Sequence, residues 1–261
     1  MSTSRVLFDT DGSIAFVTFN RPEARNAMTW DMYDALVRIC EQVDADAAIR
    51  VCILRGAGGR AFVAGTDIAE FTAFSSREDG IRYEHRIDAV IDRLERVRVP
   101  TIAQVQGYAT GGGCALALAC DLRVCTPDAR LGIPIARTLG NCLSADNYAR
   151  LLDLIGPSRL KDLLFTGRLI DAAEAAAMGL VARIADPAEL DGVVRQLAET
   201  LAANAPLTIR ATKEMVLRIQ KARRLEPGQA ENLIAACYTS EDFREGVDAF
   251  LAKRPPRFTG R

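Results

Sequence analysis

The chain has 261 residues, of which 49% are hydrophobic, and its formal net charge is −1. This length and apolar content can supply a sizeable core, either in one large domain or in a domain with an appendage. The sequence has no basic block of the kind that binds nucleic acid, and no apolar run near the roughly 20 residues of a membrane span.

The seven cysteines are scattered through apolar segments without C-x-x-C spacing. This pattern indicates neither a disulfide framework nor a zinc site, so we expect no bound metal. The N-terminus reaches an acidic residue, Asp9, too early for a signal peptide. We therefore expect a cytoplasmic protein with reduced, buried thiols.

The chain opens with a predicted β-hairpin. Residues 6–9 and 14–19 have strand character and flank Asp11-Gly12, a pair typical of a type I′ turn. Thr29 can cap the helix that follows. The apolar residues of this helix recur with helical spacing: Leu36, Ile39, Cys40 and Val43.

Strands and helices then alternate, which predicts ββα units with a parallel component. We expect strands over 51–54, 101–105 and 122–125, and helices over 78–96 and 112–119.

From residue 145 the pattern is mostly helical. Asp171 can cap a short helix that ends at Gly179, and residues 181–184 form a last predicted strand. The tail from Pro206 onward is helical, with a break at Pro227-Gly228.

Three consecutive glycines, Gly111-Gly112-Gly113, join the strand-like segment 101–106 to the apolar stretch 114–120. Glycines let a ligand approach the backbone closely, and the first N–H groups of a helix have no intrahelical partner. The segment fits a pocket for developing negative charge. It fits a tight turn onto a buried helix equally well.

A second glycine-containing loop, Arg60-Ala-Phe-Val-Ala-Gly-Thr-Asp-Ile68, gives the chain a family resemblance. It is similar to the A-F-x-A-G-x-D-I loop of the crotonase (enoyl-CoA hydratase/isomerase) superfamily. The segment 107–114 resembles that family's N-G-x-x-x-G-G-G, with Gln106 where Asn is usual. Further similar segments follow the family's order: Asn20–Ala27, Asp121–Cys125, Phe165–Arg168 and Ala173–Leu180. The resemblance covers about residues 5 to 258.

The resemblance implies an α/β fold, a crotonase-like spiral of ββα units with a helical C-terminal region. It implies a core over 1–200 that holds an acyl-CoA site. The helical region over 201–261 would cover that site and build homotrimers, often paired into hexamers. The alternative for this tail is a helical appendage packed on its own core.

The resemblance also implies the site residues. Family members hold the carbonyl oxygen of an acyl-CoA thioester between two backbone N–H groups, which by motif position are those of Thr66 and Gly112. Such donors bind the oxyanion of a transition state better than the ground-state carbonyl. The hydroxyl of Thr66 could separately cap a helix near Ile68.

Coenzyme contacts map to two further segments, and no cofactor is implied beyond coenzyme A as part of the substrate. The implied residues are Ala64, Gly65, Asp67, Ile68 and Ala69, together with Arg25 and Ala27. For Arg25 the alternative is a solvated loop charge.

The chain departs from the family at the two glutamates that hydratases use. Their positions are Ala115 and Ile135 here, and neither side chain can activate water or deliver a proton. The resemblance therefore predicts a thioester-processing lyase or isomerase without efficient enoyl-CoA hydration. The alternative is a catalytically lapsed member that only binds acyl-CoA.

Cys142 is a further candidate, because Gly140-Asn141-Cys142 stands where the related 4-chlorobenzoyl-CoA dehalogenases carry G-N-D with a nucleophilic aspartate. A thiolate there would suit a dehalogenase-like or hydrolase-like enzyme. The alternative is a small buried cysteine. Asp146, the nearest carboxylate, fits a base or a structural role in a first helical turn. His85 lies on a charged helix, where we expect exposure.

Overall fold

The computed structural model describes residues 4–74, 76–226 and 228–261. Its chain begins with the predicted hairpin, in which β1 (Val6–Asp11) pairs antiparallel with β2 (Ile14–Phe19). The turn consists of Gly12 and Ser13, and of these only Gly12 has a positive φ, 59°. A type I′ turn needs positive φ at both positions, so the hairpin prediction is confirmed and the turn type was wrong.

The strands form two sheets. The six-stranded sheet has the order β1-β2-β3-β5-β7-β10, and the four-stranded sheet has the order β4-β6-β8-β9. Every pairing is parallel except β1–β2 and β8–β9. The remaining strands are β3 (Val51–Gly56), β4 (Ala61–Val63), β5 (Thr101–Val105), β6 (Tyr108–Thr110), β7 (Leu122–Cys125), β8 (Arg130–Gly132), β9 (Ile170–Asp171) and β10 (Arg183–Ile184).

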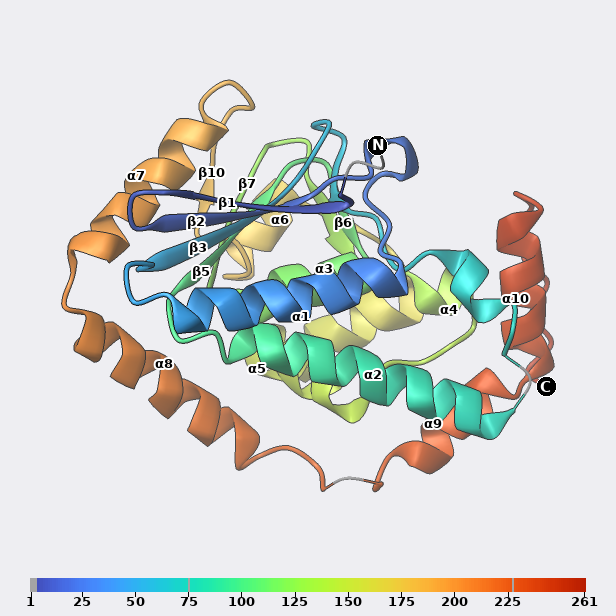
Figure 1. Ribbon diagram of the computed structural model, residues 1–261. Helices are drawn as coiled ribbons and strands as arrows, with labels where there is room; N and C mark the ends of the chain where they lie inside the picture. The colour runs from blue at the N-terminus through green and yellow to red at the C-terminus, as the bar shows by residue number, and fades with distance from the viewer. Residues whose placement is uncertain (1–3, 75, 227) are drawn as a thin grey trace.

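After the hairpin, the strand pairs β3–β4, β5–β6 and β7–β8 each give one strand to each sheet before the chain enters a helix. This confirms the predicted spiral of ββα units. The helices of the spiral are α1 (Trp30–Ala45), α2 (Arg77–Glu95), α3 (Gly112–Ala119), α4 (Ile135–Thr138), α5 (Ala145–Thr166), α6 (Ala172–Ala177) and α7 (Leu190–Ala203), with 3₁₀ turns η1 (Pro22–Ala24) and η2 (Ile68–Phe71). α1 packs against β1 and β2, and α2 lies beside α1 (Figure 1).

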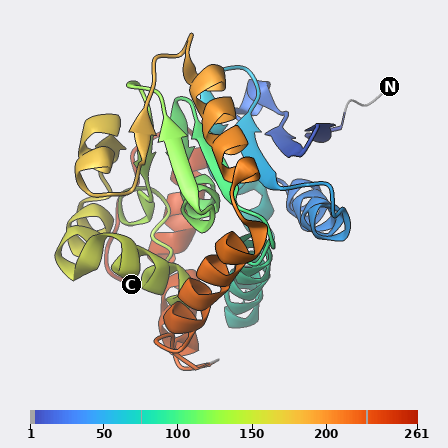
Figure 2. The same cartoon turned by 90° about the vertical axis from the view of Figure 1, so that its left-hand side faces the viewer.

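The large sheet separates two cores, because alternate side chains of a strand point to opposite faces. In β3, Cys52 and Leu54 face the main core, while Val51 and Ile53 face a smaller core under α7. Figure 2 shows α7 along that face of the sheet, with α8 continuing beyond it. α7 is therefore part of the core packing.

The sequence predicted some of the helix caps and strand boundaries correctly and others not. Asp171 caps α6 by accepting a 2.8 Å hydrogen bond from the N–H of Glu174, as predicted. Thr29 occupies the cap position of α1, but its side chain makes no capping bond and its hydroxyl is buried without a partner among the described residues. The predicted strand over 181–184 is shorter, covering only Arg183–Ile184.

The C-terminal region contains α8 (Pro206–Lys221), α9 (Glu231–Tyr238) and α10 (Glu241–Leu251). α9 packs on α2, and α10 contacts η2 and α4. α8 has no buried residue and lies at the edge of the molecule (Figure 1). Gly228 lies in the predicted break between α8 and α9, whereas Pro227 lies outside the described residues.

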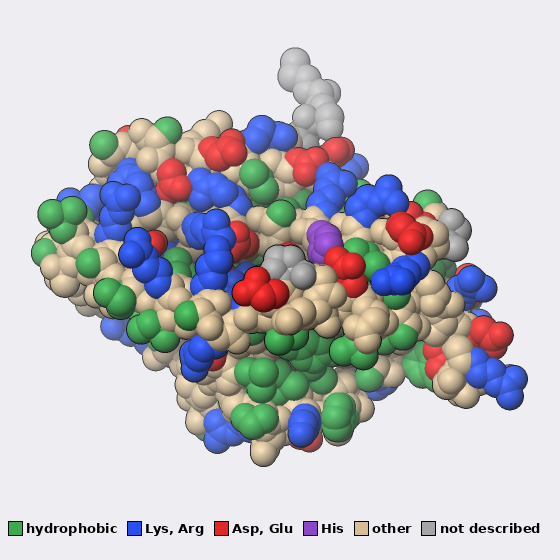
Figure 3. Space-filling view, turned by 90° about the horizontal axis from the view of Figure 1, so that it is seen from below, with side chains coloured by type: hydrophobic (Ala, Val, Ile, Leu, Met, Phe, Trp, Pro, Cys, Tyr) green, Lys and Arg blue, Asp and Glu red, His purple; other side chains and the backbone are tan. Residues whose placement is uncertain are grey.

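Seen from below, the surface mixes charges of both signs with an area of gathered apolar side chains (Figure 3). None of the helices in the described part of the chain combines the length and apolar composition needed to cross a membrane.

Candidate active site

A cavity of about 150 Å³ lies where the 64–68 loop, the start of α3, α2 and α4 meet. Phe250 of α10 also contributes to its wall. Most of its lining is apolar and includes Ile68, Phe71, Ile87, Ile133 and Leu143. The elements that form it come from the beginning, middle and end of the chain.

Backbone hydrogen bonds join the two segments to which the family resemblance assigned coenzyme contacts. The N–H of Ala64 donates to the carbonyl of Arg25 (3.1 Å), and the N–H of Met28 donates to the carbonyl of Gly65 (2.8 Å). Arg25 itself is exposed, with its guanidinium carbon 5.5 Å from the centre of the Tyr108 ring. The structure thus places a cation beside this loop pair.

Arg21 holds the same two segments together from the side. Its Nη1 lies 2.7 Å from Oδ2 of Asp67 and donates to the carbonyl of Ala27 at 3.1 Å. The other carboxyl oxygen of Asp67 accepts the N–H of Ala69 at 3.1 Å. Asp67 therefore caps the turn that begins at Ile68, and the alternative that Thr66 caps it was wrong.

Thr66 and Gly112 face each other across the cavity wall. A Cβ placed on Gly112 would lie 3.7 Å from the backbone nitrogen of Thr66 and only 2.7 Å from the hydroxyl of Tyr33. The close approach therefore requires glycine. In the described part of the chain, neither the Thr66 nor the Gly112 N–H has a protein acceptor. Both donors are available to a ligand.

Two tyrosines fix the side chain of Thr66. Its hydroxyl lies 2.8 Å from the hydroxyl of Tyr33 and 3.0 Å from that of Tyr83. Burial raises the pKa of both phenols above their usual value, so both stay neutral. These bonds orient the loop that carries the Thr66 N–H.

The two positions at which the family resemblance places the glutamates of hydratases line this cavity. Ala115 and Ile135 are both buried in its wall. At these positions the cavity offers methyl and aliphatic groups, which can neither take up nor release a proton.

Glu84 of α2 supplies a carboxyl group that the sequence analysis missed. It lines the cavity, is only 3% exposed and forms no ion pair with a described residue. Burial raises its pKa to about 8, against a hydrogen bond from Tyr238 that favours the ionised form. A signal existed: Glu84 lies on the buried stripe of α2, which comprises Gly80, Glu84, Ile87, Ile91 and Leu94.

A short hydrogen-bond chain leads from Glu84 into the wall of the cavity. The hydroxyl of Tyr238 donates to Oε1 of Glu84 (2.5 Å) and lies 3.1 Å from Nδ2 of Asn141, which donates to it. Oδ1 of Asn141 is buried and has no partner among the described residues. The polar side of the cavity therefore holds an acid and a free acceptor.

Cys142 is not among the residues that line the cavity. Its thiol lies 3.9 Å from the carbonyl oxygen of Leu233 on α9. A hydrogen bond with Cys237, and then burial, raise the pKa of the Cys142 thiol well above its usual range. The geometry favours the packing alternative over a nucleophilic thiolate.

The other two titratable candidates also lie outside the cavity. Asp146 is 3.5 Å from Arg224, and His85 is 3.4 Å from Glu231 with its side chain 55% exposed. The predicted exposure of His85 is confirmed. All seven cysteines are free thiols, six of them buried, and no metal-binding cluster is present in the described ranges.

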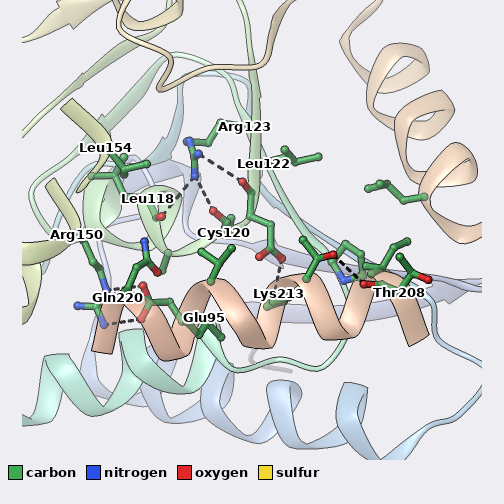
Figure 4. Close-up of a pocket in the computed structure, with 18 residues that line it drawn as sticks. Glu95, Leu118, Cys120, Leu122, Arg123, Arg150, Leu154, Thr208, Lys213 and Gln220 are labelled. Carbon is green, nitrogen blue, oxygen red and sulfur yellow. Dashed lines mark hydrogen bonds and ion pairs between the residues drawn. The ribbon is translucent and has the colours of Figure 1, made fainter. Parts of the chain in front are cut away.

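A larger hollow of about 430 Å³ lies between α8 and the core (Figure 4). Its charged side chains have partners. Arg123 donates to carbonyls at the end of α3, including that of Cys120 (2.6 Å), and Lys213 lies 2.7 Å from Asp121. A buried cation at a helix C-terminus is favourable, so packing accounts for Arg123.

The spiral of ββα units defines a protein of the crotonase fold. A family model for enoyl-CoA hydratase/isomerase matches residues 9–261. The chain belongs to the enoyl-CoA hydratase/isomerase family, which confirms the resemblance found in the sequence.

Individual relatives agree with this assignment. The chain is 33% identical to a short-chain-enoyl-CoA hydratase of Clostridium acetobutylicum, over 97% of each protein. It is 38% identical to a putative enoyl-CoA hydratase of Thermus thermophilus, over 95% of this chain and 98% of that protein. Among solved structures, a methylmalonyl-CoA decarboxylase in complex with 2-nitronate-propionyl-CoA is 27% identical, with a TM-score of 0.91 and complete coverage of both chains.

Proposed function

We propose that this protein binds a short acyl-CoA thioester and stabilises an enolate or tetrahedral oxyanion between the N–H groups of Thr66 and Gly112. The observation that carries the proposal is the pair of unpaired backbone donors beside an apolar cavity. Donors fixed before the reaction stabilise developing charge without reorganisation, and removing one costs roughly 3–4 kcal/mol in other enzymes.

The size of the cavity supports a short acyl group. A cavity of about 150 Å³ is comparable to one that holds a benzene molecule in another protein. The relatives named above, an enoyl-CoA hydratase and a methylmalonyl-CoA decarboxylase, are also named for CoA thioesters. The loop pair with Arg25, Ala27, Ala64, Gly65, Asp67, Ile68 and Ala69 is our proposed coenzyme contact.

We do not propose efficient enoyl-CoA hydration, because Ala115 and Ile135 replace both acid–base groups. The second candidate function is a lapsed family member that binds acyl-CoA without turnover, and this replacement is the observation that favours it. A dehalogenase-like or hydrolase-like reaction would need Cys142 to reach the thioester.

Calorimetry with butyryl-CoA and with free butyrate tests the binding step. We expect the CoA ester to bind and the free acid not to bind, because the two loops address the coenzyme as well as the carbonyl. Equal affinity for the two compounds would contradict the proposal. Butyryl-CoA binding without any reaction of bound thioesters would support the lapsed alternative.

We also propose that the C-terminal region forms the contacts of a homotrimer, alone or paired into a hexamer. The support is α8, which buries none of its residues and leaves Leu207 78%, Met215 59% and Ile219 54% exposed. Light scattering should give three or six times the monomer mass, and a monomer would contradict this.

A further inference from the structure

We propose that Glu84 is the acid–base group of the acyl site and exchanges a proton with the α-carbon of the bound acyl group. This inference rests on the proposed function, since it needs a thioester held by Thr66 and Gly112. It assigns the proton transfer to a helix that carries neither of the two positions at which hydratases have their glutamates.

The placement of Glu84 is the first argument. In the described lining of the cavity, Glu84 is the sole carboxylic acid, and it shares that lining with Thr66 and Gly112. The cavity is small, about 150 Å³, so an acyl group inside it comes close to every wall. A carboxyl group enclosed with the substrate can reach a reacting carbon without crossing solvent.

The second argument is the way the carboxyl group is held. The Tyr238 hydroxyl donates to Oε1 of Glu84 at 2.5 Å, and this bond orients the carboxyl group. No arginine or lysine of the described residues pairs with it to keep it ionised. At neutral pH the group is mostly an acid, and its base form becomes abundant near pH 8.

Other titratable groups lie around Glu84, and the experiment must distinguish their titration from that of Glu84. They come from α1, α2, α5, α9 and the loop before α5: Tyr33, Tyr83, Asp88, Tyr148, Cys237, Tyr238 and Cys142. Of these, Tyr238 lowers the pKa of Glu84 through its hydrogen bond and Asp88 raises it through its charge.

The proposed step is balanced. The carboxylate of Glu84 removes a proton from the α-carbon, and the electron pair of that C–H bond forms the C=C bond of an enolate. The negative charge moves to the thioester oxygen, where the Thr66 and Gly112 N–H groups bind it. The reverse step returns a proton from the Glu84 carboxyl to the α-carbon.

The alternative is a purely structural role, in which Glu84 only ties α9 to α2 through Tyr238. Glu84→Gln separates the two roles, because the amide oxygen can still accept from Tyr238 but the side chain no longer exchanges a proton. Asp88→Asn is the matched control on the same helix, since Asp88 is not among the cavity-lining residues.

The experiment is to hold each protein with butyryl-CoA in D₂O and to follow deuterium entry at the α-carbon by mass spectrometry. We expect exchange by the unmodified protein to rise with pH through about 8. The exchange rate of the Glu84→Gln protein should be roughly 10²- to 10⁴-fold lower. Its affinity for butyryl-CoA, measured by calorimetry, should be unchanged. Asp88→Asn should retain exchange.

The position of the pH profile gives a readout that a structural role would not move. Tyr238→Phe removes a bond that favours the ionised carboxylate, so the inflection should move to higher pH. Asp88→Asn removes a nearby negative charge, so the inflection should move to lower pH.

Two results would overturn the inference. One is a Glu84→Gln protein that binds butyryl-CoA and exchanges as fast as the unmodified protein. The other is an unmodified protein that binds butyryl-CoA but shows no deuterium entry at the α-carbon above the rate without protein. Failure of the unmodified protein to bind butyryl-CoA is a different result, because it removes the proposed function and this inference with it.

Discussion

The hydroxyl of Tyr238 donates a 2.5 Å hydrogen bond to the buried carboxyl group of Glu84. The two residues are 154 positions apart in the sequence and belong to α9 and α2. Through this bond the C-terminal region holds a carboxyl group that lines the candidate cavity. Burial, position and protonation of Glu84 all depend on that contact.

Stability should depend on pH through Glu84. Its pKa rises from 4.5 to about 8 on folding, so between these values the native state holds a proton that the unfolded chain has lost. The contribution of Glu84 to the free energy of unfolding is therefore fully present below pH 4.5 and is lost as the pH rises through about 8. One pKa unit corresponds to about 1.4 kcal/mol, so the loss is on the order of a few kcal/mol.

Urea unfolding of the Glu84→Gln protein and the unmodified protein at pH 5 and pH 8 measures this effect. We expect the unfolding free energy of the unmodified protein to fall more between pH 5 and pH 8 than that of the Glu84→Gln protein. Asp88, whose pKa is raised to about 6, is present in both proteins, so the comparison reports the effect of Glu84 together with its interaction with Asp88. A constant difference across pH would contradict a buried, neutral Glu84.

Hydration of crotonyl-CoA should be orders of magnitude slower than in a family member that has both glutamates. Each missing acid–base group is worth roughly 10²- to 10⁴-fold in rate. Steady-state assays of the two proteins at the same pH measure the ratio. A turnover in the range of efficient hydratases would mean that other residues fill the roles of the two missing glutamates.

Gly112→Pro should abolish thioester chemistry, because it removes one oxyanion donor. Proline is tolerated at the first position of a helix, which Gly112 occupies in α3. Any added Cβ meets the Tyr33 hydroxyl at 2.7 Å, so Gly112→Ala is the control that carries the same crowding and keeps the N–H.

The ratio of deuterium exchange rates in these two variants isolates the donor. We expect Gly112→Pro to fall a further 10²- to 10³-fold below Gly112→Ala, provided that both proteins fold. Equal rates would exclude the Gly112 N–H from the oxyanion site.

Cys142→Ser should leave activity nearly intact. The thiol packs against α9, so the change should cost about 1–2 kcal/mol of stability by burying a more polar group. Activity of the folded variant, set beside its unfolding free energy, is the measurement. Loss of activity in a stable variant would instead identify Cys142 as a nucleophile, because a serine hydroxyl is far less ionised.

Much of the fold and part of the site could be predicted because their signals are local. The glycines of the two loops, the periodicity of α1 and the Asp171 cap depend on neighbours in the sequence. Ala115 and Ile135, which the family resemblance put at the positions of the hydratase glutamates, line the cavity in the structure.

Local patterns were insufficient where a second, distant contact sets the outcome. Thr29 stands at the start of α1 as predicted, yet its hydroxyl makes no capping bond. The hydroxyl of Thr66 bonds to Tyr33 and Tyr83 instead of capping a helix, because α1 and α2 both pack against its loop. The hydrogen bonds of Thr66 to these two tyrosines therefore depend on tertiary packing.

Glu84 shows most clearly the difference between features set by local sequence and features set by tertiary packing. The sequence by itself determined the family and the spiral fold, since both are written in short segments, and it predicted an oxyanion loop pair and the loss of two glutamates. Only the tertiary structure decided that a glutamate on a charged helix is buried in the wall of the same cavity as that loop pair. The physical reason is that its desolvation depends on packing of α9, whose Tyr238 supplies the hydrogen bond that makes burial tolerable.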